Sequence, residues 1–155
     1  MRRAEREITD RAQIEEIIAR AQVCHLALLD GDWPYLVPLS YGYRDGVLYL
    51  HSAPTGLKIE LLRRNPQVCF EMETDVALLP AESACGFGMR YRSVIGRGVA
   101  RLIADPQAKA AALDVIMAHY DAPGPHPYAP AALERMLVIA VDIVALSGKQ
   151  AHAPR

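Results

Sequence analysis

The sequence predicts a single α+β domain, residues 1–155, in which six strands form an antiparallel barrel flanked by two or three helices. Three observations carry this prediction. The length of 155 residues corresponds to one domain. The apolar periodicity changes from 3.6 to 2 after the first twenty residues. Turn signals then separate successive alternating segments by only a few residues, which favours sequential hairpins over parallel crossovers.

Three segments have helical patterns. The first covers about 10–21, where Ile14, Ile17, Ile18 and Ala21 recur on one face and Asp10 can cap the start. The second is a short helix over 54–65. The third opens at Asp105 with a proline in its first turn, and its apolar stripe consists of small and branched residues.

Six segments are predicted to be strands, because their apolar residues either alternate with polar ones or follow one another without interruption. We expect these strands over 23–29, 33–43, 47–53, 67–73, 91–104 and 136–146. The Asp-Gly pair at 45–46 predicts a tight hairpin between the second and third. Residues 74–90 and the proline-rich segment 121–130 are expected to be a loop and an irregular crossing.

Composition excludes several classes of function. Apolar residues make up 52% and charged residues 23%, which is typical of a globular protein, and 17 basic against 18 acidic residues leave a net charge of −1. This balance argues against nucleic acid or an anionic membrane as a partner. No signal peptide, spanning segment, metal motif or disulfide framework is visible, so we expect a cytoplasmic protein without a metal site. Three cysteines are present: Cys24 and Cys69 lie in apolar runs, and Cys85 lies in a loop.

The segment 37–64 carries the chemistry that the sequence suggests. Pro38 removes a hydrogen-bond donor within a strand, which indicates an edge, a bulge or a ligand face. Farther on, Ser52 and Thr55 precede a helix that has Lys58 in its first turn. A helix start offers free N–H groups and a positive dipole end, so phosphate is a suitable ligand there. Arg63 and Arg64 could reach the same anion or could form a solvated face.

Several runs resemble the pyridoxamine 5'-phosphate oxidase-like split-barrel flavoproteins, and most of all the branch that contains the nitroimidazole-resistance reductases. The resemblance covers nearly the whole chain in order and weakens over 74–90 and 121–130. The runs that carry it are residues 34–43, 48–53, 56–59 and 63–70, together with Met1-Arg2-Arg3, Tyr91-Arg92-Ser93-Val94 and Ser147-Gly148-Lys149.

The resemblance implies a dimeric six-stranded split β-barrel with one FMN in each of two clefts between the subunits. The backbone of Pro38, Leu39 and Ser40 would lie along the flavin ring. Ser52, Ala53 and Lys58 would bind the phosphate. Further contacts would come from Arg92, Ser93 and Lys149, in the same subunit or in its partner.

His51 has two interpretations. Its place in the strand is compatible with a partly buried, hydrogen-bonded histidine. The resemblance implies instead a histidine that faces the cofactor and substrate and acts in catalysis.

The implied function is an FMN-dependent oxidoreductase that reduces a nitroaromatic or quinone-like electrophile with a nicotinamide donor. Because flavin supplies the reactive centre, the sequence needs no acid–base constellation of its own. A non-enzymatic flavin reservoir or sensor, a haem-binding split barrel and a deazaflavin-binding split barrel remain alternatives.

Overall fold

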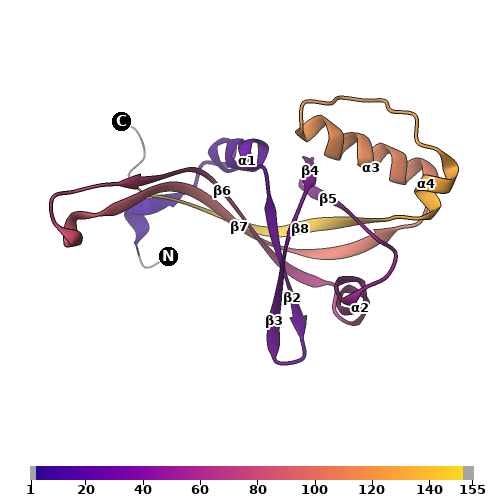
Figure 1. Ribbon diagram of the computed structural model, residues 1–155, viewed down its shortest axis with the longest axis horizontal. Coiled ribbons are helices and arrows are strands. Elements are labelled where there is room, and N and C mark those ends of the chain that lie inside the picture. The colour runs from indigo at the N-terminus through magenta and orange to yellow at the C-terminus, as the bar shows by residue number, and fades with distance from the viewer. Residues whose placement is uncertain (1–2, 152–155) are drawn as a thin grey trace.

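A single sheet curls into a barrel because the strands at its two ends are consecutive in the chain (Figure 1). The computed structural model describes residues 3–151, so Met1 and Arg2 of the opening motif lie outside the described residues. The strand order is β3-β2-β6-β7-β8-β5-β4, and β1 pairs with β8. The strands are β1 (Glu7–Ile8), β2 (Cys24–Asp30), β3 (Trp33–Leu39), β4 (Tyr41–Arg44), β5 (Val47–Ser52), β6 (Gln67–Leu79), β7 (Gly88–Ile103) and β8 (Leu137–Ala151).

The predicted strand over 33–43 is two strands, which corrects the sequence interpretation. β3 pairs with β2 and β4 pairs with β5, and Ser40 alone joins them. Alternation of apolar residues shows which side chains point to the interior of the sheet, so it continues through Ser40. It does not show which strand lies beside each segment. This division and the two-residue β1 raise the six expected strands to eight, within the α+β class that was predicted.

The helices begin where their capping residues predicted. The carboxylate of Asp10 accepts from Ala12 N at the start of α1 (Arg11–Arg20), and Asp105 accepts from Ala108 N at the start of α3 (Pro106–His119). The second helix, α2 (Leu57–Arg64), begins three residues later than expected, after Gly56. A short α4 (Pro130–Glu134) follows the proline-rich crossing. None of the helices described here is long and apolar enough to cross a membrane.

The core has two parts on opposite faces of the sheet. Inside the barrel, aliphatic side chains and the rings of Tyr41 and Phe70 pack with the apolar faces of α1 and α2. Outside it, α3 and α4 cover β4, β5 and the start of β8. Gly42 makes this second contact possible, because a Cβ at that position would lie 2.5 Å from the carbonyl oxygen of Val115 in α3. Among the described residues, this first cluster of aliphatic and aromatic side chains therefore fills the barrel interior.

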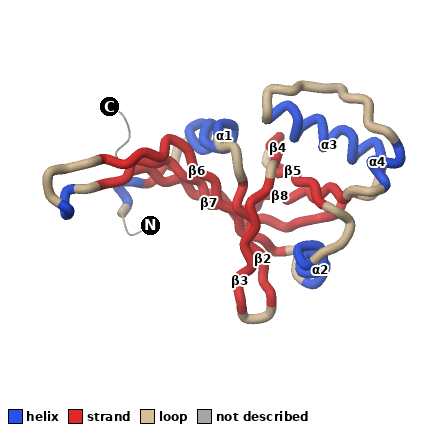
Figure 2. The backbone as a smooth tube through the Cα atoms, viewed as in Figure 1, coloured by secondary structure: helices blue, strands red, loops and turns tan. Residues whose placement is uncertain are grey.

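The segment 74–90 forms the end of a long hairpin in place of the expected loop (Figure 2). We call this part of β6 and β7, up to Ser93 and including the paired end of β8, the arm. Strands β6 and β7 pair from Gln67↔Val99 to Leu79↔Gly88, interrupted by a bulge between Thr74 and Ala77. Within the bulge, Asp75 has a φ of 58°, a value that few residues other than glycine adopt. The bulge breaks the two-residue alternation, which hid the strand from sequence analysis.

Candidate functional site

The connection from β5 to α2 forms a polar cradle that was predicted to hold a phosphate. β5 ends at Ser52, which is half-buried, and Ala53 follows in the exposed turn. Gly56 caps α2 with a φ of 120°, and its carbonyl accepts from the N–H groups of Ile59 and Glu60. The N–H groups before these belong to the helix start, where no intrahelical carbonyl can accept them. The predicted phosphate ligands Ser52, Ala53 and Lys58 therefore all lie in one connection, between the end of β5 and the first turn of α2.

Lys58 lies in the first turn of α2 and is the charged group of this cradle. Its side chain is half-buried, and burial lowers the pKa of its ammonium group. Among residues 3–151 no carboxylate comes within ion-pair distance of it. An ammonium group that is partly desolvated without a counter-charge favours a bound anion, which would replace the lost hydration and raise the pKa again.

The strand junction at Ser40 lies beside this cradle. In the β4–β5 ladder Tyr41 pairs with Leu50, so Ser40 comes level with His51. His51 is exposed and makes no side-chain hydrogen bond with another described residue. In the single subunit this imidazole is therefore open to a ligand or to a partner subunit. Pro38 and Leu39 at the end of β3 pair with His25 and Cys24 of β2.

The remaining predicted residues lie on the arm, and they divide between two faces. Ser93 and Lys149 are direct cross-strand neighbours on β7 and β8, and the Lys149 ammonium lies 5.7 Å from the ring centre of Tyr91. Arg92 points to the opposite face, toward α1, where its guanidinium contacts Glu16 at 3.1 Å. Arg92 and Ser93 therefore cannot line one face of the sheet together.

Strand β8 separates the arm residues from the cradle within one chain. His51 pairs with Val138 near the start of β8, and Ser93 pairs with Lys149, eleven residues later on the same strand. At ~3.3 Å per residue this separation is about 36 Å of strand. One subunit therefore does not bring Lys58 and Lys149 to the same ligand.

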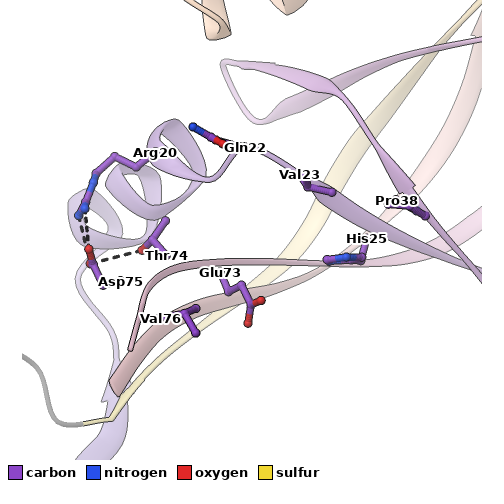
Figure 3. A pocket seen from close by; sticks show the side chains of 9 residues that line it. All are labelled: Arg20, Gln22, Val23, His25, Pro38, Glu73, Thr74, Asp75 and Val76. Carbon is purple, nitrogen blue, oxygen red and sulfur yellow. Dashed lines mark hydrogen bonds and ion pairs between the residues drawn. The ribbon is translucent and has the colours of Figure 1, made fainter. Parts of the chain in front are cut away.

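A cavity of about 610 Å³ opens between the end of α1, the start of β2 and the bulge in β6 (Figure 3). Pro38 is the one predicted site residue that lines it, and His25 and Glu73 lie across from the ion pair of Arg20 with Asp75.

His25 belongs to a small titratable group at this cavity. His25 Nδ1 lies 3.3 Å from Glu71 Oε2 on the adjacent strand. Burial, followed by repulsion from Glu73, raises the pKa of Glu71. His25 itself is half-buried within β2. Its position opposite Pro38 follows from the pairing of β2 with β3, which local sequence patterns do not encode.

Comparison with known proteins identifies relatives over almost the whole chain. A family profile described as pyridoxamine 5'-phosphate oxidase matches residues 10–150. The structure of a candidate 5-nitroimidazole antibiotic resistance protein from Bacteroides thetaiotaomicron superposes with a TM-score of 0.84. That protein is 36% identical, and the match covers 93% of this chain and 86% of that one.

Two further structures carry flavin in their descriptions. An FAD-binding protein from Mesorhizobium loti has a TM-score of 0.69 at 27% identity, with 94% of this chain and 97% of that one covered. An FAD and heme binding protein from Mycobacterium smegmatis has a TM-score of 0.85 at 20% identity, with 96% and 74% covered, a likeness of fold alone. An uncharacterized protein of Rhizobium meliloti is 32% identical over 65 residues, which are 42% of this chain and 42% of that protein. These likenesses confirm the predicted split-barrel fold.

Proposed function

The chain belongs to the pyridoxamine 5'-phosphate oxidase family, and on this basis we propose that it binds FMN and passes electrons through it to a small electrophile. The acceptor would be a nitroaromatic or quinone-like compound, and the donor a nicotinamide nucleotide. The observation that carries the proposal is the half-buried Lys58 at the start of α2, which has no counter-charge within residues 3–151. The flavin named in the descriptions of two related structures supports it.

The cradle suits the phosphate of FMN. The Ser52 hydroxyl, the backbone at Ala53 and the open N–H groups after Gly56 would donate to its oxygens, and Lys58 would supply the charge. Phosphate carries close to two negative charges at neutral pH, which Lys58 and the helix dipole offset together. The chain thus has several donors and one cation on a single turn for one anion.

The junction at Ser40 suits the edge of the flavin ring. Pro38 has no N–H, so a flat ring can approach the strand there without leaving a donor unpaired. Leu39 and Ser40 would continue this edge toward His51. When bound, FMN supplies the hydride or electron transfer. His51 would orient the acceptor and hold a proton for it on an imidazole nitrogen.

We propose that the complete site needs a homodimer. Lys149 and Ser93 lie about 36 Å of strand away from the cradle in their own chain, so they would contact the flavin bound by the partner subunit. The outer sheet face near them exposes Ile95, Val99 and Val144, apolar residues suited to cover by a second copy. Arg92 would act from the α1 side of the same arm.

The visible spectrum of freshly purified protein tests the cofactor. We expect flavin absorption bands and release of FMN on denaturation. Release of FAD, a haem Soret band or a deazaflavin spectrum would show that the protein binds that cofactor in place of FMN. A colourless protein that cannot be reconstituted with any flavin would overturn the proposal.

Acceptor kinetics separate a reductase from a flavin reservoir or sensor. A reductase passes electrons from reduced flavin to a nitroaromatic or quinone faster than to oxygen. Equal rates for all acceptors would favour the non-enzymatic alternative.

Subunit complementation tests the contribution of the partner. Lys58→Met and Lys149→Met each alter both sites of a homodimer. If the two lysines serve one site from different subunits, a mixed dimer has one intact site and one site that lacks both lysines. Purified mixed dimers should therefore bind one FMN with native affinity. Two equally weak sites would contradict the arrangement in trans.

A further inference from the structure

A second cavity, of about 470 Å³, lies between α1 and the arm and is lined by polar side chains only. We call it the arginine pocket: three arginines, two glutamines and two carboxylates form its walls. A cavity lined by polar and charged residues suits a polar ligand better than the ring of a flavin or of an aromatic acceptor. Its ligand must be polar and must match the charge of the walls.

The three arginines and two carboxylates together give the walls a net charge of +1. Arg20 holds Asp75 through two contacts of 2.6 and 3.2 Å. Glu16 lies 3.1 Å from Arg92 and 3.3 Å from Arg20, so it is shared between two guanidinium groups. Arg90 has no ion pair with any residue in 3–151. The pocket therefore attracts anions, although its own two carboxylates oppose them.

Two of these arginines, Arg90 and Arg92, each have one donor without an acceptor in the described part of the chain, although Arg92 also contacts Glu16. The Nε atoms of Arg90 and Arg92 are buried and have no partner among the described residues. Only 12% of the Arg92 side chain is exposed. These Nε atoms have almost no accessible surface, so a ligand in the pocket would meet the outer guanidinium nitrogens. Arginine pairs best with groups that offer two oxygens at once, such as carboxylate and phosphate.

The arginine pocket shares a wall with the cavity beside Pro38. Arg20 and Asp75 line both, so their ion pair separates a polar space from one that also contains Pro38, Val23 and Val76 (Figure 3). A ligand with an apolar, planar part and an oxyanion would place the first beside Pro38 and the second among the arginines.

From this arrangement we propose that the arginine pocket binds a phosphate or diphosphate group, at a site separate from the Lys58 cradle. This inference goes beyond the proposed function: the second phosphate of a dinucleotide flavin is bonded to the first, which the Lys58 cradle would hold, so the group in the arginine pocket belongs to a separate anion. Arg90 supplies the unpaired charge, Arg92 a second guanidinium, and Gln13 and Gln150 neutral donors. Glu16 is the competitor that a bound anion displaces from Arg92.

Pyrophosphate is the probe that tests the site without flavin. It should bind the full-length chain in calorimetry and raise its melting temperature. Arg90→Gln should weaken binding about tenfold or more, the effect of one charge-assisted hydrogen bond. Arg44→Gln, which removes the same charge at the exposed β4–β5 turn, should leave it unchanged.

A second variant gives an effect in the opposite direction. Glu16→Gln removes the competing carboxylate and should tighten pyrophosphate binding by several fold, a gain that misfolding cannot produce. No pyrophosphate binding by the unaltered chain, or equal losses in Arg90→Gln and Arg44→Gln, would overturn the proposal.

Competition with FMN distinguishes this pocket from the proposed flavin site. If pyrophosphate binds the FMN-loaded chain as tightly as the flavin-free chain, the arginine pocket is separate from the Lys58 cradle. If bound FMN prevents pyrophosphate binding, the two anions share one site and the proposal is overturned. A chain that binds no flavin at all would refute the proposed function and leave the pyrophosphate result standing.

Discussion

Replacement of Lys58 by methionine tests the phosphate cradle most directly, because it removes the charge and keeps the length of the side chain. A hydrogen bond to a charged group contributes ~1.5–3 kcal/mol, which corresponds to roughly 10–150-fold in affinity. Lys58 is only half-buried, so solvent screening favours the lower part of this range. We expect FMN to bind Lys58→Met about 10–30-fold more weakly, as measured by quenching of FMN fluorescence at constant ionic strength.

The matched control is Arg63→Met, which removes an exposed charge from the last turn of the same helix. Screening should limit its effect to about twofold. If both variants lose affinity equally, FMN responds to the overall field of α2 and the cradle is wrong. If neither loses affinity, the phosphate binds elsewhere.

The pH dependence of FMN binding is an independent test of the role of Lys58. Burial lowers the pKa of Lys58 in the free chain, whereas a bound phosphate favours the protonated amine. FMN affinity should therefore fall as pH rises through the lowered pKa, and Lys58→Met should not show this step. Without ligand the sign reverses: between the folded and the unfolded pKa the unfolded chain binds more protons, so stability rises with pH there. An affinity that is flat across this alkaline window in the unaltered chain would contradict the role of Lys58.

Three further predictions concern the frame around the site. Gly42→Ala places a Cβ 2.5 Å from the Val115 carbonyl and should destabilise the fold by ~1–3 kcal/mol in urea unfolding, whereas a neutral effect would mean that α3 shifts freely. Asp114→Ala removes an acceptor that holds the loop between α3 and α4 and should cost ~1–2 kcal/mol, with earlier proteolysis of that loop as its signature. Cys85 is exposed and should react with a thiol reagent at pH 8, but burial raises the pKa of Cys24 to about 12, so Cys24 should react only after unfolding.

Sequence predicted the local elements of this fold well, because their signals are local. The caps at Asp10 and Asp105 and the turn at 45–46 act within a few residues of themselves. The division at Ser40 and the bulge at Asp75 depend on which strands pair, a long-range choice that alternation does not encode. The arm was accordingly taken for a loop.

The candidate site divides in the same way. The turn from Ser52 to Lys58 is continuous in sequence, and its helix start identified it. Ser93 and Arg92 are adjacent in sequence but lie on opposite faces of a strand, which only the two-residue period of β7 reveals once its pairing is fixed. No sequence motif includes Arg90. It becomes part of a pocket only because folding places Glu16 and Arg20 of α1 against the arm.

The bulge in β6 connects these observations. A regular β6 would continue the ladder without interruption, and Asp75 would have no reason to adopt a φ of 58°. With the bulge, the Asp75 carboxylate meets Arg20, and this pair forms the wall between the two cavities. Asp75 thus combines a left-handed backbone conformation with an ion pair that lines both cavities. The same residues that end the barrel ladder define both the space beside Pro38 and the arginine pocket, so the bulge positions the anion site proposed there.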